Sequence, residues 1–94
     1  MNLLITGAAS GLGRELALDL AREGNDLALF DRNSEPLHAT AQECFELGSN
    51  TVPVVGDVTN PEDCRRLVDA AAERFGRIDG LIANAGVRMW AKVE

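Results

Sequence analysis

Long apolar runs are absent from this sequence of 94 residues. No hydrophobic stretch approaches the roughly 18 residues that a membrane-spanning helix requires. The amino-terminal residues also lack the basic segment and the apolar segment of a secretory leader. The sequence therefore predicts a cytoplasmic protein without a membrane partner.

Positive charge is also scarce. Nine lysine and arginine residues stand against fifteen aspartate and glutamate residues, so the net charge is −6, and no basic tract is present. An acidic surface repels the nucleic-acid backbone and anionic lipid headgroups. We therefore expect no nucleic-acid partner and no binding to an anionic membrane surface.

Cysteine and histidine are rare. Cys44 and Cys64 form no CxxC motif and no other metal-binding spacing, and both fall within helical patterns, where buried and reduced thiols are expected. His38 is the only histidine and lies near the start of a predicted helix. We expect it at the helix surface without a catalytic role, and we expect no metal site.

The residues that are present indicate one ordinary globular domain over residues 1–94. Hydrophobic residues make up 46% of the chain and charged residues 26%. Four apolar runs alternate with three helical patterns, and runs without polar alternation are typical of parallel strands buried on both faces. The expected strands are 2–6, 26–31, 51–55 and 80–83, and the expected helices are 11–23, 34–47 and 61–75, whereas 87–94 shows no strong pattern.

Each predicted helix has an apolar stripe and recognisable ends. Ser34 and either Thr59 or Asn60 are the expected N-caps of the second and third helices, and a glycine follows each helix. We expect the stripes to face the sheet. They comprise Leu12, Leu16 and Leu20, then Leu37, Ala41, Cys44 and Phe45, then Cys64, Leu67, Val68, Ala71, Ala72 and Phe75.

The order βαβαβαβ predicts an α/β fold, namely part of a Rossmann-type doubly wound parallel sheet. Right-handed crossovers favour the strand order 3-2-1-4. Pro53 supports this order, because proline is tolerated only at the edge of a sheet or at a bulge. The fourth strand would then be an open edge beside an uncovered sheet face. We therefore expect the chain to be marginally stable or to self-associate there.

A glycine-rich stretch, TGAASGLG at residues 6–13, lies between the first strand and the first helix. Gly7 would allow the tight turn, Gly11 the approach of phosphates, and Gly13 close packing of the helix on the sheet. Ser10 can donate from its hydroxyl, and Leu12 belongs to the helix start, whose backbone N–H groups suit a pyrophosphate. The alternative is a tight turn without a ligand.

Polar residues follow the second and third strands. Asp31 can accept both adenosine ribose hydroxyls, which favours NAD, whereas Arg32 can pair with the extra phosphate of NADP. A solvated polar pair is the alternative. Asp57 and Val58 can address adenine, and the alternative for Asp57 is an Asx turn.

The fourth strand ends at Asn84, Ala85 and Gly86. Small residues at this position leave room for the nicotinamide side of the cofactor. Asn84 can also brace neighbouring strand ends through side-chain hydrogen bonds. The alternative is a strand end followed by a glycine turn.

Together these motifs resemble the short-chain dehydrogenase/reductase family in its main single-domain branch. The resemblance rests on TGAASGLG at residues 6–13, Asp31, GDVT at 56–59 and ANAG at 83–86, where the family usually has NNAG. It implies an NAD(P)-dependent oxidoreductase acting on alcohols or ketones. It also implies contact of Asp57 with adenine and a place for Asn84, Ala85 and Gly86 beside the cofactor.

One departure from the family limits this interpretation. Family catalysis uses a serine and a Tyr-x-x-x-Lys pair on later elements, but this chain has no tyrosine and its only lysine is Lys92. We therefore assign no catalytic residue. We expect an amino-terminal cofactor-binding part of a longer enzyme. The alternatives are a nucleotide-binding module without catalysis and an assembly subunit that pairs through the fourth strand.

Overall fold

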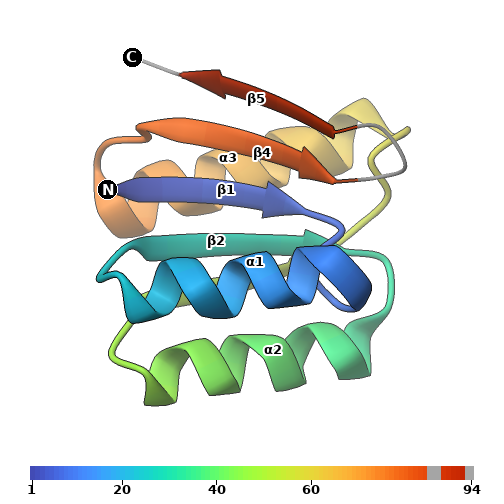
Figure 1. Ribbon diagram of the computed structural model, residues 1–94. Helices are drawn as coiled ribbons and strands as arrows, with labels where there is room; N and C mark the ends of the chain where they lie inside the picture. Colours follow the sequence, from blue (N-terminus) through green and yellow to red (C-terminus); the bar gives the residue numbers. More distant parts are fainter. Residues whose placement is uncertain (85–87, 93–94) are drawn as a thin grey trace.

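The computed structural model describes residues 1–84 and 88–92, the latter by their backbone. Within these residues, strands and helices alternate from β1 to β4, and β5 follows β4 directly. One sheet contains the five described strands in the order β3-β2-β1-β4-β5 (Figure 1). The first four strands are parallel and confirm the predicted order. The bounds of the helices and strands are β1 Asn2–Thr6, α1 Gly11–Arg22, β2 Asp26–Asp31, α2 Ser34–Glu46, β3 Thr51–Val55, α3 Pro61–Phe75, β4 Gly80–Asn84 and β5 Arg88–Lys92.

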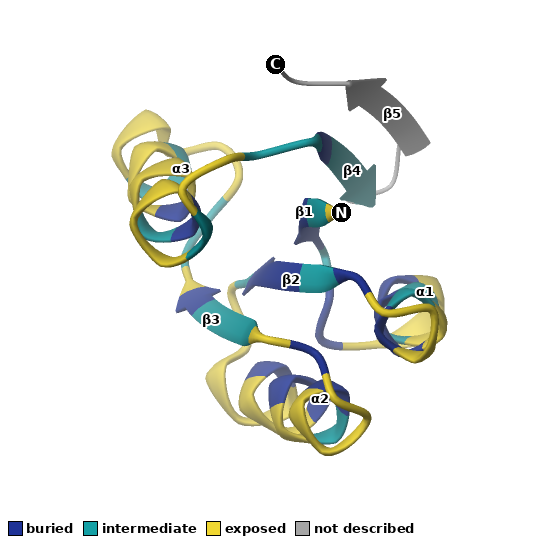
Figure 2. Cartoon of the chain, turned by 90° about the vertical axis from the view of Figure 1, so that its left-hand side faces the viewer, coloured by how far each residue is buried: buried dark blue, intermediate teal, exposed yellow. Residues whose placement is uncertain are grey.

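Helices cover the sheet on both faces, which explains the continuous apolar runs in the strands. Helices α1 and α2 lie on one face and α3 on the other (Figure 2). Residues Leu3, Ile5, Leu27 and Leu29 pack with the first pair, whereas Leu4, Ala28, Phe30 and Val54 pack with α3. Successive strand residues therefore enter opposite cores, as the pleat of a strand requires.

The helix ends follow the expected chemistry with one exception. Gly24, Gly48 and Gly76 have φ values of 90°, 100° and 77°, the left-handed region that favours glycine after a helix. Asn60 caps α3 by accepting a hydrogen bond from the Glu62 N–H at 2.9 Å. Ser34 was the expected cap of α2 but is its first residue, because Asn33 occupies the N-cap position.

The apolar stripes were predicted less accurately than the helices. Phe45 is 65% exposed, Leu12 48% and Val68 46%, although all three were expected to face the sheet. In α2 the buried side chains are Leu37, Thr40, Ala41 and Cys44. Thr40 can take a buried position because its hydroxyl donates to the Pro36 carbonyl at 3.1 Å. The buried face is therefore rotated away from Phe45.

Pro53 lies on edge strand β3, as predicted. The Leu27 N–H donates to the Asn50 carbonyl and the Gly56 N–H donates to the Asp31 carbonyl, both at 3.0 Å. Strand alternation then directs the backbone nitrogen of Pro53 away from β2, so no bond of the sheet is lost. The Val55 carbonyl accepts a hydrogen bond from Arg66 Nη2 at 2.9 Å. This edge is therefore partly closed.

Strand β5 corrects the expectation that the fourth strand is an open edge. It pairs antiparallel with β4 along its whole length, from Gly80 opposite Lys92 to Asn84 opposite Arg88. Residues 87–94 show no strong strand pattern in the sequence, so β5 was not predicted, and only its pairing with β4 identifies it. Self-association stays a prediction, but β4 is not the edge that would support it.

No helix within the described residues is long and apolar enough to cross a membrane. Among the same residues there is no group of three or more histidine, cysteine or acidic side chains placed to hold a metal ion.

The two cysteines have different surroundings. Cys44 is buried, as expected, whereas Cys64 is only half-buried, and its thiol lies 3.4 Å from the Val58 carbonyl. Burial raises the pKa of the Cys44 thiol to about 11. Neither cysteine forms a disulfide among the described residues.

We expect one thiol to react quickly and one slowly with Ellman's reagent at pH 8. A pKa of about 11 leaves roughly a thousandth of the Cys44 thiol ionised at that pH, and burial also blocks the reagent. Cys44 should therefore react only when the protein unfolds. The Cys64→Ser variant should lose the fast phase, whereas loss of the fast phase in Cys44→Ser would contradict the assignment.

Candidate functional site

The carboxyl ends of β1, β2 and β3 enclose a small pocket. Its volume is about 170 Å³, and its lining combines the first turn after β1 with the segments that follow β2 and β3. The lining residues are Gly7, Asp31, Arg32, Asn33, Gly56 and Val58. Open α/β sheets bind ligands at this end of their strands. Four of the predicted cofactor-binding residues are thus brought together, and their role stays a prediction.

Two glycines of the stretch are required by close backbone packing. Gly7 has a φ of 67°, and a Cβ at this residue would overlap the Asn84 carbonyl oxygen. A Cβ at Gly13 would overlap the Gly7 carbonyl oxygen and would lie 2.6 Å from Asn84 Nδ2. Helix α1 therefore begins in direct contact with the turn at residues 7–10, called the glycine turn below, and with the end of β4.

Gly11 is required for a different reason. Its φ is 58°, yet no heavy atom lies within 4 Å of the position that a Cβ would take. The space beside the start of α1 is therefore open. A bound group can approach the backbone here without meeting a side chain.

The amino terminus of α1 has no compensating negative charge in its first turn. Helix α2 has Glu35 there and α3 has Glu62 and Asp63, whereas α1 has no acid. Ser10 is exposed at the N-cap, and its side chain makes no capping hydrogen bond. Leu12 is half-exposed beside it. The N–H groups and the positive dipole end are thus available to an anion.

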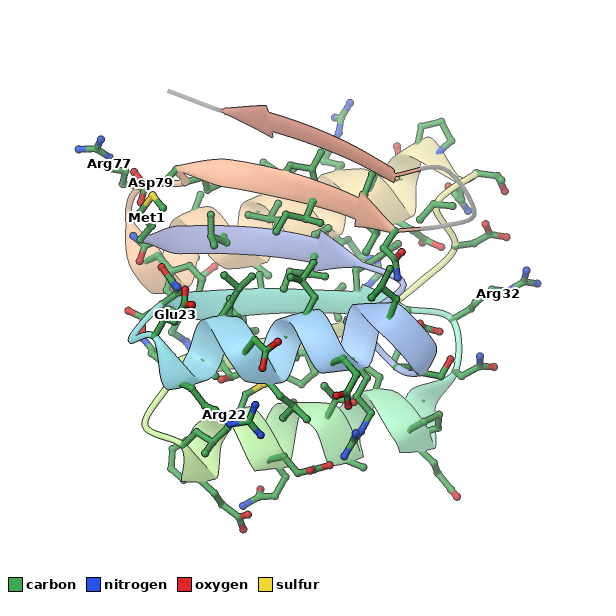
Figure 3. The ribbon with its side chains drawn as sticks, viewed as in Figure 1. Met1, Arg22, Glu23, Arg32, Arg77 and Asp79 are labelled. Atoms are coloured by element: carbon green, nitrogen blue, oxygen red, sulfur yellow. The ribbon has the colours of Figure 1, made fainter. Side chains whose placement is uncertain are left out.

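Asp31 is one of the residues that line the pocket. Its Oδ2 accepts from the Ala9 N–H and its Oδ1 from the Asn33 N–H, both at 3.0 Å. Arg32 is exposed and extends away from the ribbon (Figure 3). The carboxylate therefore faces the glycine turn, whereas the guanidinium points to solvent.

Asp57 forms the local turn that was the alternative to adenine binding. Its Oδ1 accepts from the Thr59 N–H at 2.9 Å and from the Thr59 hydroxyl at 2.8 Å, and these bonds lower the pKa of the Asp57 carboxyl. The Asp57 N–H donates to Asp63 Oδ2 at 2.9 Å, which lowers the pKa of that carboxyl. The segment 56–59 is thus fixed to α3, with the half-exposed Val58 beside the pocket.

Asn84 joins the ends of two strands, as its side chain was expected to do. Its N–H donates to Thr6 Oγ1 at 3.1 Å, and its Nδ2 lies 3.5 Å from the Gly7 carbonyl oxygen. Ala85 and Gly86 were predicted to lie beside the cofactor, and they fall outside the described residues.

Sequence reasoning missed Asn33, the role of Ala9 and the reason why residue 56 is glycine. A Cβ at Gly56 would lie 2.7 Å from the Phe30 ring and 2.9 Å from Asp63 Cβ, so only glycine lets this segment close over the strand. The glycine directly after an apolar strand was a usable signal for Gly56. No sequence signal identifies the backbone N–H of Ala9 as the partner of Asp31.

The arrangement has the chemistry of a binding site. Backbone N–H groups at the start of α1 border an open space that suits an anionic group. The Asp31 carboxylate, which can accept from hydroxyl groups, lines the pocket. Among the residues that the structure describes, the pocket lining includes no histidine, cysteine or lysine.

Comparisons with known proteins agree with this geometry. A family model described as short chain dehydrogenase matches residues 1–94. The chain is 49% identical over 93 residues to 11-beta-hydroxysteroid dehydrogenase 1A of Arabidopsis thaliana, which covers 98% of this chain and 27% of that relative. The chain therefore spans about a quarter of the length of the curated relatives it matches.

Solved structures show the same fold. Carveol dehydrogenase from Mycobacterium avium in complex with NAD aligns with a TM-score of 0.86 and 35% identity, covering 92% of this chain and 35% of that one. NAD+-bound xylitol dehydrogenase aligns with a TM-score of 0.86 and 40% identity, covering 92% of this chain and 33% of that one.

Proposed function

Since the chain belongs to the short chain dehydrogenase family, we propose that it binds a nicotinamide dinucleotide for an oxidoreductase that acts on an alcohol or a ketone. The bound cofactor supplies the hydride chemistry at its nicotinamide ring. Residues 1–84 supply the binding surface for the adenosine and phosphate parts. We assign no catalytic group to these residues.

The start of α1 supports this proposal most directly. It combines the open space beside Gly11 with a first turn that has no acid and an N-cap that makes no side-chain bond. A pyrophosphate supplies the negative charge and the acceptor atoms that this helix end lacks. The adenosine would then lie toward the pocket at Asp31 and Val58.

We further propose a preference for NAD over NADP. The Asp31 carboxylate lines the pocket, and a 2′-phosphate beside it would be repelled. Arg32 also lines the pocket and is the residue that could reverse this preference; its side chain extends away from the ribbon (Figure 3). Two of the solved relatives were obtained with NAD.

We expect NAD to bind at least tenfold more tightly than NADP, a margin that corresponds to about 1.4 kcal/mol. Isothermal titration calorimetry with both dinucleotides measures this difference. Arg32→Ala should lower the affinity for NADP more than the affinity for NAD, because Arg32 lines the pocket and its guanidinium can pair with a 2′-phosphate. Equal affinities for NAD and NADP would contradict the preference, and no binding of either would contradict the proposed function.

A second candidate function is nucleotide binding without turnover. The open start of α1 supports it as well, because a phosphate site of this kind serves binding with or without turnover. Saturable binding of NADH, followed by fluorescence, combined with no oxidation of NADH in the presence of ketones would support this candidate. Turnover would exclude it.

A further inference from the structure

Asp31 connects three segments of the site. Its carboxylate accepts from the Ala9 N–H in the glycine turn and from the Asn33 N–H at the start of α2, and both bonds are 3.0 Å long. Its backbone carbonyl accepts from the Gly56 N–H, also at 3.0 Å. The glycine turn, the start of α2 and the segment after β3 therefore meet at Asp31, the last residue of β2.

The bond to Ala9 is the contact that matters for a phosphate site. The neighbouring Ala8 N–H donates to the Phe30 carbonyl at 3.2 Å, so two consecutive N–H groups of the turn are tied to the end of β2. Only one of these two acceptors is charged, and bonds to charged acceptors are the stronger kind. Asp31 thus holds the turn against the sheet just before the N–H groups of α1 begin.

The same carboxylate retains the capacity to bind a hydroxyl group. An ionised carboxylate has about four lone-pair positions on its two oxygens. The two backbone N–H groups occupy one position on each oxygen. Asp31 is only half-buried and lines the pocket, so a ligand can reach the remaining positions.

We propose that Asp31 is a positioning residue for the phosphate-binding glycine turn, in addition to its role as acceptor for the ribose. The proposal rests on the proposed function. The Asp31 carboxylate holds the turn in the geometry that presents the N–H groups at the start of α1. Loss of this carboxylate therefore weakens the binding of a phosphate group even when the ligand has no ribose hydroxyl.

The two roles of Asp31 predict opposite effects on one ligand. The probe 2′,3′-dideoxyadenosine diphosphate keeps the phosphates and lacks both ribose hydroxyls. If Asp31 acts only on the ribose, Asp31→Ala removes one negative charge near an anionic ligand and leaves the affinity unchanged or tighter. If Asp31 also holds the glycine turn, the same substitution weakens the affinity.

The experiment compares the wild-type protein with Asp31→Ala by calorimetry, using adenosine diphosphate and the dideoxy probe. We expect Asp31→Ala to weaken binding of the dideoxy probe by roughly fivefold, and of adenosine diphosphate by a larger factor, because that ligand also loses its hydroxyl acceptor. If Asp31→Ala does not fold, Asp31→Asn takes its place in the experiment, because the asparagine side chain has nearly the same shape as that of aspartate.

The matched control is Asp19→Asn, which removes one negative charge from the exposed face of α1. Asp19 pairs only with Arg22 at 2.8 Å among the described residues, so its substitution should change both affinities less than twofold. Amide hydrogen exchange of the free protein provides a readout that needs no ligand. We expect the Ala9 amide to exchange roughly tenfold faster in Asp31→Ala, whereas Ala8 keeps its backbone acceptor.

The outcomes separate the inference from the proposed function. Weaker binding of the dideoxy probe together with faster exchange at Ala9 supports the positioning role. Unchanged or tighter binding of the probe overturns it, even when adenosine diphosphate still binds. If the wild-type protein binds neither ligand, the proposed function fails and the inference fails with it, whatever the exchange at Ala9 shows.

Discussion

Gly13→Ala is expected to destabilise the protein by about 3 kcal/mol and to abolish dinucleotide binding. A Cβ at this residue would overlap the Gly7 carbonyl oxygen and would lie 2.8 Å from the Gly7 carbonyl carbon. Backbone atoms cannot move aside as a flexible side chain can, so α1 must shift away from the turn. For a domain of this size, about 3 kcal/mol lowers the melting temperature by roughly 12 °C or more.

Gly11→Ala is the matched control, because the two glycines lie in the same stretch. Gly11 has a φ of 58° but no neighbour within 4 Å of a Cβ. The cost to folding is therefore the backbone strain alone, about 1–2 kcal/mol. Binding should nevertheless decrease, because the methyl group enters the space that we assign to the phosphates. Equal melting temperatures for Gly13→Ala and wild type would contradict the close packing of α1.

Phe30→Ala is expected to cost about 3–5 kcal/mol of the free energy of unfolding. The ring is fully buried between the sheet and α3, among Leu4, Val54 and Leu67. It also lies against Gly56, which lines the pocket. Total stabilities of small domains are about 5–15 kcal/mol, so this loss should leave a substantial unfolded fraction at 37 °C. Urea titration followed by circular dichroism measures it.

Phe45→Ala removes the same side chain from a surface and serves as the comparison. Phe45 is 65% exposed at the end of α2, so the variant should unfold within about 0.5 kcal/mol of wild type. A loss of stability similar to that of Phe30→Ala would show that Phe45 is buried in solution and would contradict the structure.

Features that depend on the local chain could be predicted from the sequence. Proline at residue 53 indicated an edge strand, because the missing N–H is tolerated only where no strand pairs. The glycines after each helix indicated helix ends, because their positive φ values are costly for other residues. The strand order followed from these ends and from the handedness of the crossovers.

Features that depend on packing between distant residues could not be predicted. The stripe in α2 included Phe45 because apolar character and spacing both favoured it, but the buried face of the helix is rotated toward Thr40. Strand β5 was missed because residues 88–92 show no strong sequence pattern, whereas its pairing with β4 joins residues on two different strands.

In the candidate site, too, the features that depend on the local chain could be predicted and those that depend on distant residues could not. The positions of Gly7, Gly11 and Gly13 were identifiable, because a strand and a helix flank the stretch. The contacts of the Asp31 carboxylate with two backbone N–H groups could not be predicted, because every residue except proline has a backbone N–H and the residue type of Ala9 gives no sign of this contact. The sequence allowed two roles for Asp57, an Asx turn and contact with adenine. The structure shows the turn with Thr59, and the adenine contact stays a prediction.

The edge at β3 also limits how copies of this chain could polymerise. Pro53 offers no N–H there, and the Val55 carbonyl is already engaged by Arg66. A fibre that grows by joining sheets needs two competent edges on every subunit, one to receive and one to extend. Because β3 lacks one N–H and its Val55 carbonyl is already engaged, extension of the sheet from this edge is disfavoured.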